Sequence, residues 1–204
     1  METRNVVKTG PLLVVISGPA GVGKDAVLRE LRKRGIQAHF GVTATDRPRR
    51  PNEVHGRDYY FVNTAEFQRM IEAGELLEHA LVYDKNYGIP RKPIREALEA
   101  GLDVIVRLDV QGAATVRRLA PEAVLIFLAP SSEEELAERL RRRGTDSPDQ
   151  LALRLGKFRE EMERIPEFDY VVLNRDNHLD EAVDRVVAII TAEHCRVRQR
   201  TVRL

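Results

Sequence analysis

The chain has 204 residues, enough for one α/β domain with insertions that buries roughly 70% of its unfolded surface. Its 33 Lys and Arg nearly balance its 32 Asp and Glu, so the formal charge of +1 provides no general basic field and we expect no nucleic-acid partner. A single cysteine, Cys195, excludes an internal disulfide and a cysteine-rich zinc site. No apolar stretch approaches the ~20 residues of a membrane span, and residues 1–9 are polar, so we expect a cytoplasmic protein with no membrane partner.

The first predicted element is a buried strand over residues 12–17, followed at once by Gly-Pro-Ala-Gly-Val-Gly-Lys at 18–24. Glycines let successive backbone N–H groups converge on anionic oxygens, and a helix that begins near Lys24 directs the positive end of its dipole to the same point. The lysine ammonium completes the cradle, so the sequence predicts a nucleoside triphosphate site. We assign to this site Gly18, Pro19, Ala20, Gly21, Val22, Gly23, Lys24, Asp25 and Ala26.

Asp25 stands where the usual loop pattern has a Ser or Thr whose hydroxyl holds Mg²⁺. A carboxylate close to triphosphate oxygens is tolerable when Mg²⁺ lies between them or when it binds metal-bound waters. We therefore hypothesise that Asp25 is an inner- or outer-shell Mg²⁺ ligand.

Residues 42–90 interrupt the regular alternation with prolines, arginines and tyrosines, and with short strand-like pieces at 58–62 and 76–82. One interpretation is a solvated charged loop. The other is a second anion pocket around Arg47, Arg50 and Tyr59, because arginine presents a fixed fork to phosphate oxygens and a tyrosine hydroxyl adds a short donor. Two phosphate pockets in one small chain suggest transfer between them.

Further apolar runs alternate with amphipathic segments, which is typical of parallel strands joined by crossover helices and predicts an α/β fold. These runs cover residues 103–108, 123–128 and 169–173. Capping patterns predict helix starts near residues 132 and 147.

Two features near the C-terminal end are also predicted from local patterns. The basic helix end at 139–143 and the glycine stop at 144–146 are expected to form a hinge. A last amphipathic helix is expected from about residue 179 to the mid-190s, followed by a frayed basic tail at 196–203.

The stretch from Thr43 to Phe61 is similar to the monophosphate-binding pattern of guanylate kinases, Ser-x-Thr-Thr-Arg-x-x-Arg-x-Gly-Glu-x-x-Gly-x-x-Tyr-x-Phe. Later stretches resemble later motifs of that family in the same order, over a span of about residues 12 to 190. They are Leu-Glu-His-Ala at 77–80, Asn-Tyr-Gly-Ile-Pro at 86–90, Leu-Asp-Val-Gln-Gly-Ala at 108–113, Arg-Leu and Arg-Gly-Thr within 139–145, and Asp-Tyr-Val-Val-Leu-Asn at 169–174. The chain is therefore identified as a member of the guanylate kinase family.

The resemblance implies a P-loop NTPase three-layer fold with a parallel sheet core, an inserted mixed α/β GMP-binding region and a helical lid. The implied division is a core of residues 1–41, 92–138 and 167–204, a GMP-binding insertion at 42–91 and a lid at 139–166. It also implies ATP and Mg²⁺ as cofactors and a monomer or homodimer that binds small nucleotides.

The same resemblance assigns the acceptor site. It implies that Arg47, Arg50, Tyr59 and Tyr87 hold the phosphate of GMP, and that Glu78 and Thr43 read the guanine. A carboxylate suits this role because it accepts from both the N1–H and the 2-amino group of guanine, whereas adenine presents a lone pair at N1. The predicted substrate site is completed by Glu53, Gly88 and Asp109, of which Asp109 orients either metal-bound water or an acceptor arginine.

On the donor side, the resemblance places Arg139, Arg143 and Arg154 in a mobile lid over the ATP phosphates and Asn174 near the adenine. An exposed basic helix face is the other interpretation of these arginines. The expected catalytic residues are Lys24, Arg47, Arg50, Arg139 and Arg154. The implied reaction is transfer of the ATP γ-phosphate to GMP or dGMP, which gives GDP and ADP, in purine nucleotide metabolism.

Four positions depart from the family pattern: Asp25, Asp46 in place of the second Thr, Asn52 in place of Gly, and Ile89 in place of a Ser/Thr that resembles an O6 contact to guanine. We expect a weakened guanine preference, and we expect Ile89→Ser to tighten GMP binding. The Gly-Lys-Asp variant also resembles ribose 1,5-bisphosphate phosphokinases, which is the enzymatic alternative. A catalytically inactive guanylate-kinase-like binding module is the non-enzymatic one.

Overall fold

A parallel sheet forms the centre of the protein in the computed structural model, which describes residues 10–82, 84–143 and 148–204. Within these residues the sheet has five strands in the order β2-β7-β1-β8-β9, and every neighbouring pair is parallel. The strands are β2 (Ala38–Phe40), β7 (Asp103–Arg107), β1 (Leu13–Ser17), β8 (Val124–Ala129) and β9 (Tyr170–Leu173). The four strands and the α/β class expected from the sequence are confirmed.

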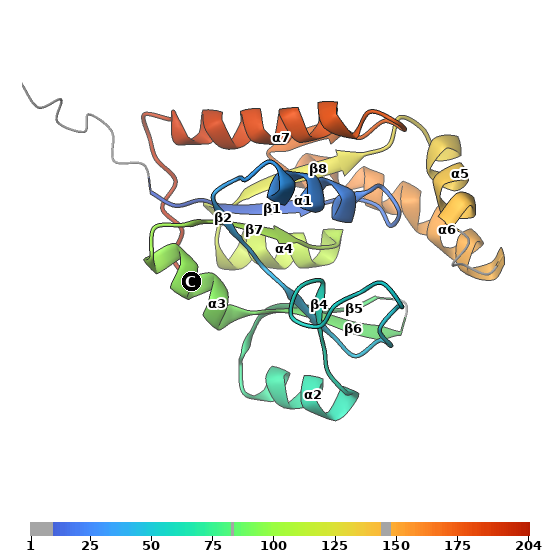
Figure 1. Cartoon of the computed structure of the whole chain (residues 1–204), viewed down its shortest axis with the longest axis horizontal. Coiled ribbons are helices and arrows are strands. Elements are labelled where there is room, and N and C mark those ends of the chain that lie inside the picture. The colour runs from blue at the N-terminus through green and yellow to red at the C-terminus, as the bar shows by residue number, and fades with distance from the viewer. Residues whose placement is uncertain (1–9, 83, 144–147) are drawn as a thin grey trace, which may run out of the picture.

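Helices cover both faces of this sheet, as the continuous apolar strands require (Figure 1). On one face, α1 (Lys24–Lys33) and α7 (Leu179–His194) bury Leu31 and Val186 against the strands. On the other, α3 (Arg91–Glu99) and α4 (Val110–Leu119) bury Ile94 and Val116. The strands therefore form a rigid platform with the glycine loop at the carboxyl end of β1.

A second, smaller sheet lies beside the carboxyl ends of β1 and β7 (Figure 1). Its order is β4-β3-β6-β5, with β3 parallel to β4 and antiparallel to β6. Its elements are β3 (Thr43–Thr45), β4 (Tyr59–Phe61), α2 (Thr64–Glu72), β5 (Leu76–Val82) and β6 (Lys85–Pro90). Phe67 and Met70 of α2 pack on Ala44 and Leu76 of the sheet. The short strands expected near 58–62 and 76–82 are confirmed.

Two helices follow β8 at the far end of the molecule (Figure 1). They are α5 (Glu133–Arg143) and α6 (Pro148–Glu163), and the short 3-10 helix η1 (Ile165–Glu167) leads from them into β9. The Ser132 hydroxyl accepts a hydrogen bond from the Glu135 N–H at 3.2 Å, which confirms the helix start expected there. Helix α6 begins at Pro148, as expected, whereas Ser147 and the expected hinge at 144–146 lie outside the described residues.

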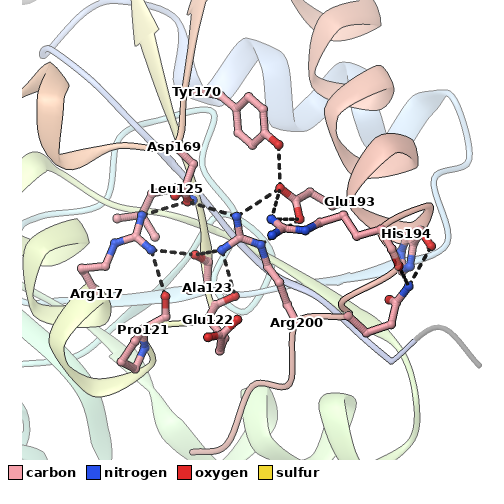
Figure 2. A network of polar contacts seen from close by, with 12 residues as sticks. Arg117, Pro121, Glu122, Ala123, Leu125, Asp169, Tyr170, Glu193, His194 and Arg200 are labelled. Atoms are coloured by element: carbon pink, nitrogen blue, oxygen red, sulfur yellow. Dashed lines mark hydrogen bonds and ion pairs between the residues drawn. The ribbon is translucent and has the colours of Figure 1, made fainter.

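The C-terminal tail is anchored, which corrects the expectation that residues 196–203 fray. Arg200 is only 9% exposed and binds Glu193 at the end of α7 and the Ala123 carbonyl before β8 (Figure 2). Val202 and Leu204 pack against the apolar side chains between the sheet and α4. The sequence prediction was wrong because it treated a run of arginines as solvated. One of these arginines, Arg200, instead pairs with the buried carboxylate of Glu193, which lies close to it in the sequence.

No helix among the described residues is long and apolar enough to cross a membrane.

Candidate active site

The glycine loop between β1 and α1 has the backbone that only glycines adopt without strain. Gly18, Gly21 and Gly23 have φ angles of 135°, 88° and 100°. A Cβ at Gly21 would lie 2.5 Å from Cδ2 of Leu140, and one at Gly23 would lie 2.5 Å from Nδ2 of Asn174. The glycines are therefore required both by conformation and by close packing of α5 and Asn174 on the loop.

Lys24 lies inside this loop and satisfies its ammonium with loop carbonyls. Its Nζ donates to the Gly18 oxygen at 2.5 Å and to the Pro19 oxygen at 3.0 Å. Burial lowers the pKa of Lys24 to about 8, against a partial opposing effect of the Glu161 carboxylate. An anion in the loop favours the charged ammonium, so this lysine is poised to bind phosphate.

A pocket with an empty volume of about 860 Å³ opens between the glycine loop and the second sheet. The pocket brings together residues that are far apart in the sequence. They come from the glycine loop after β1, from β3, β5 and β6, from the end of β7 and from α6. Its lining is Ala20, Gly21, Lys24, Asp25, Thr43, Arg47, Arg50, Tyr59, Glu78, Ala80, Val82, Tyr87, Arg107, Leu108, Asp109 and Arg154. Most of the residues assigned from the sequence to either phosphate site thus share one cavity.

The side of the pocket predicted from the sequence to hold the acceptor is built around Arg47 and two tyrosines. The Arg47 guanidinium binds both oxygens of Glu53 at 2.8 and 2.5 Å and lies 4.7 Å from the ring centroid of Tyr59. Tyr59 and Tyr87 meet edge to face, with centroids 6.2 Å apart. Glu53 also accepts from the Arg50 N–H at 2.9 Å. Glu53 therefore orients the Arg47 guanidinium and holds the backbone at Arg50, and it does not itself line the pocket.

The opposite wall carries Glu78 and Thr43, which are 4% and 5% exposed. Burial, and then the nearby Asp109 carboxylate, raise the pKa of Glu78 to about 8. Asp109 caps α4, because its Oδ1 accepts from the Gly112 N–H at 2.7 Å. A Cβ at Gly112 would lie 2.7 Å from Oε2 of Glu78, so this glycine makes room for the carboxylate.

Two donor-side residues expected in the site contact the glycine loop and do not line the pocket. Asn174 donates from Nδ2 to the Val22 oxygen at 2.7 Å. Arg139 donates to the same Val22 oxygen at 3.2 Å and to the Asn174 oxygen at 2.6 Å, and it also pairs with Glu135. In this structure both residues hold the glycine loop through the Val22 carbonyl, outside the pocket. Arg154 lines the pocket, and the Arg143 side chain lies outside the described part of the chain.

Two residues of β6 differ from their expected placement. Gly88 is buried, and a Cβ there would lie 2.8 Å from Cδ1 of Leu76, so close packing explains the glycine. Ile89 stands opposite Glu78 in the sheet register but is fully buried among apolar side chains and does not line the pocket. The expected tightening of binding by Ile89→Ser does not follow from this placement, because the substitution would bury a hydroxyl in an apolar cluster.

Sequence reasoning missed Arg107, which lines the pocket at the end of β7. Its guanidinium pairs with Asp25 and lies 4.7 Å from the ring centroid of Tyr59. The only signal for it in the sequence is an arginine at the end of an otherwise apolar strand, directly before Leu108 and Asp109. Asp25 itself, expected at a metal, is engaged by this arginine.

A glycine loop with a buried lysine that faces arginines and tyrosines across one cavity defines the class of P-loop kinases. The family model described as guanylate kinase matches residues 11–193. Guanylate kinase 2, chloroplastic/mitochondrial, of Oryza sativa is 50% identical over 95% of this chain and 68% of its own length. Guanylate kinase of Nocardia farcinica is 46% identical over 90% of this chain and 95% of its own.

A crystal structure of guanylate kinase from Anaplasma phagocytophilum superposes with a TM-score of 0.78 at 30% identity, over 93% of this chain and 89% of that one. The chain therefore belongs to the guanylate kinase family.

Proposed function

We propose that the pocket binds GMP between β3, β5 and β6 and the phosphates of ATP at the glycine loop, and that the protein transfers the γ-phosphoryl group of ATP to GMP. The observation that carries this proposal is that one cavity joins Lys24 of the loop to Arg47, Tyr59 and Glu78. It places a cation for the donor, a cation for the acceptor phosphate and a carboxylate for the base around one space.

In the transfer, a phosphate oxygen of GMP attacks the γ-phosphorus of ATP, and the bond from that phosphorus to the β,γ-bridging oxygen breaks to release ADP. The acceptor phosphate is already ionised near neutral pH, so no dedicated general base is required. The contribution of the protein is positioning and charge stabilisation. Lys24 and Arg154 face the donor phosphates, while Arg47 and Arg50 hold the acceptor phosphate in line.

Guanine recognition is assigned to Glu78 and Thr43. An ionised Glu78 accepts from N1–H and the 2-amino group of guanine, and each charge-assisted bond contributes about 1.5–3 kcal/mol. Adenine offers neither donor at these positions, so AMP would gain none of these bonds to the ionised carboxylate. This argument supports GMP or dGMP as the acceptor.

Mg²⁺ is expected with ATP, and the pocket fits it in a limited way. Mg²⁺ usually keeps several waters and binds through one or two carboxylates together with substrate phosphates. The carboxylates of the pocket besides Glu78 are Asp25, paired with Arg107, and Asp109, which caps α4. Because Arg107 already engages Asp25, Asp109 is the carboxylate that would hold the ion, which would supply charge neutralisation at the β- and γ-phosphates when bound.

The proposed division of labour follows the same geometry. Residues 42–91 form the GMP-binding region, residues 139–166 form the lid, and the remainder is the core. Closure of both regions on the nucleotides would exclude water and suppress ATP hydrolysis. A place in purine nucleotide metabolism follows from the substrates. The cytoplasmic location and the monomeric or dimeric state stay predictions from the sequence.

A steady-state assay with a panel of acceptors tests the proposal. We expect ADP formation from ATP and Mg²⁺ with GMP and dGMP, little with AMP, and none above background with ribose 1,5-bisphosphate or with no acceptor. Arg50→Ala should lower kcat/KM for GMP by about 10- to 100-fold, since each charged bond contributes about 1.5–3 kcal/mol. The exposed Arg95→Ala serves as control. Turnover of ribose 1,5-bisphosphate but not GMP would overturn the proposal.

A further inference from the structure

Arg107 is a buried cation in the pocket that neither phosphate-binding motif contains. It ends β7 and is in register with Ile16 of β1, so its side chain emerges at the sheet edge where the glycine loop begins. The side chain is 14% exposed. Burial lowers the pKa of Arg107 to about 10, which leaves the guanidinium protonated near neutral pH. A buried charge of this kind needs a partner or a ligand.

The partner in the structure is Asp25. Nη1 of Arg107 pairs with Oδ1 of Asp25, whose own side chain is 60% exposed. At this loop position the usual Ser or Thr serves the metal ion. Here the residue after the lysine carries a full negative charge that is directed to a guanidinium from β7. A carboxylate neutralised in this way can stand close to a triphosphate without the metal ion between them.

The second contact of Arg107 points to the acceptor side. The guanidinium carbons of Arg107 and Arg47 each lie 4.7 Å from the ring centroid of Tyr59. Both oxygens of Glu53 occupy the fork of Arg47, whereas the pair with Asp25 occupies Nη1 of Arg107. The Nε and Nη2 groups of Arg107 are not used in that pair, and a guanidinium presents its N–H donors in a fixed fork that suits phosphate.

We propose that Arg107 is a phosphate-binding residue at the junction of the two sites, which contacts the phosphate of the nucleoside monophosphate beside Tyr59, and that Asp25 positions Arg107 as its counter-ion. This inference rests on the proposed function, because it names a further residue of the same acceptor site. It reassigns Asp25 from a metal-binding role to a positioning role.

Binding measurements without ATP and without metal test Arg107 separately from catalysis. Calorimetry should compare GMP with guanosine, which has the same base and sugar but no phosphate. For Arg107→Gln we expect the Kd of GMP to rise by about 10- to 100-fold, as loss of a charged hydrogen bond implies, with the Kd of guanosine changed less than about twofold. Arg107→Lys keeps the charge without the fork and should lie between. Arg95→Gln, an exposed arginine on α3, is the matched control.

The outcomes separate the two proposals. If the wild-type protein fails to bind GMP, the proposed function fails. If the wild type binds GMP and Arg107→Gln binds it equally well, only the role of Arg107 fails. Parallel losses for GMP and guanosine would also overturn it, because they would make Arg107 a structural link between Tyr59 and the glycine loop. Unchanged melting temperatures of the variants verify that the comparison is made on folded protein.

Asp25 is tested by a double-mutant cycle. Asp25→Asn should raise the Kd of GMP by about threefold or more when Arg107 is present. In the Arg107→Gln background the same substitution should change the Kd by less than about 1.5-fold, because the two residues act as a unit. The Mg²⁺ concentration that half-saturates MgATP binding should be unchanged by Asp25→Asn. A several-fold rise in that concentration, with additive effects on GMP binding, would show that Asp25 serves the metal and would overturn its assignment as a counter-ion.

Discussion

Arg200 and Glu193 form a two-pronged ion pair that joins the C-terminal tail to the end of α7 (Figure 2). Nε of Arg200 donates to Oε2 of Glu193 at 2.8 Å, and Nη2 donates to Oε1 at 3.1 Å. The Tyr170 hydroxyl donates to the same carboxylate at 2.6 Å. Glu193 is fully buried, so the stability of its charge depends on these donors.

Replacing Arg200 should therefore destabilise the fold even though it lies near the end of the chain. Arg200→Met leaves Glu193 with a buried charge and fewer donors, and we expect the free energy of unfolding to fall by about 3 kcal/mol. Urea denaturation at pH 7 measures this. Arg198→Met, at an exposed position two residues earlier, should change the free energy by less than about 0.5 kcal/mol. Equal effects of the two variants would mean that the tail is not anchored.

The pairing of Glu193 with Arg200 also predicts that the folded protein loses stability in acid. The donors from Arg200 and Tyr170 outweigh burial and lower the pKa of Glu193 to about 2. A carboxylate whose pKa is lower in the folded state stabilises it in full above its unfolded pKa of ~4.3, and this stabilisation of about 3 kcal/mol is lost as the pH falls towards 2. Glu193→Gln should flatten the loss of stability between about pH 4.3 and about pH 2, the window between these pKa values. The exposed Glu138→Gln should leave the slope unchanged.

The lowered pKa of Lys24 predicts that ATP affinity falls as the pH rises. With a pKa of about 8 in the free protein, its ammonium loses its proton as the pH rises through that value. Since phosphate binds the charged form, metal-free ATP affinity should be constant below about pH 7 and fall by up to tenfold per pH unit above about pH 8. Lys24→Met should bind weakly with no such pH dependence and keep its melting temperature. Lys92→Met, at an exposed lysine of α3, should behave as the wild type.

The raised pKa of Glu78 predicts that a proton is released when GMP binds. With a pKa of about 8, its carboxyl is largely protonated at pH 7 in the free protein. The N–H donors of guanine favour the ionised form, so binding should release a proton and strengthen as the pH rises towards 8. Calorimetry of GMP binding at pH 7 in two buffers with different ionisation enthalpies measures that proton. Glu78→Gln should abolish the release and weaken GMP by about 10- to 100-fold. Persistent release in this variant would contradict the assignment.

Much of the fold was predictable because its signals are local. The apolar runs of β1, β7, β8 and β9 are continuous, since both faces of a parallel sheet are buried. The glycine loop was predictable because its backbone requires glycines at fixed positions. The frayed tail was a wrong prediction, since the partners of Arg200 include Ala123, whose proximity depends on the packed fold.

The sequence by itself determined the glycine loop, the order of the motifs along the chain, and the cluster of arginines and tyrosines between residues 47 and 61. Each of these depends on residue type and short spacing. Only the tertiary structure decided that Asp25 pairs with Arg107, that Glu53 orients Arg47, and that Glu78 is buried beside Asp109. These relationships join residues from different strands and loops. Their partners are set by the register of β1 and β7 and by the packing of the second sheet, which no local pattern specifies.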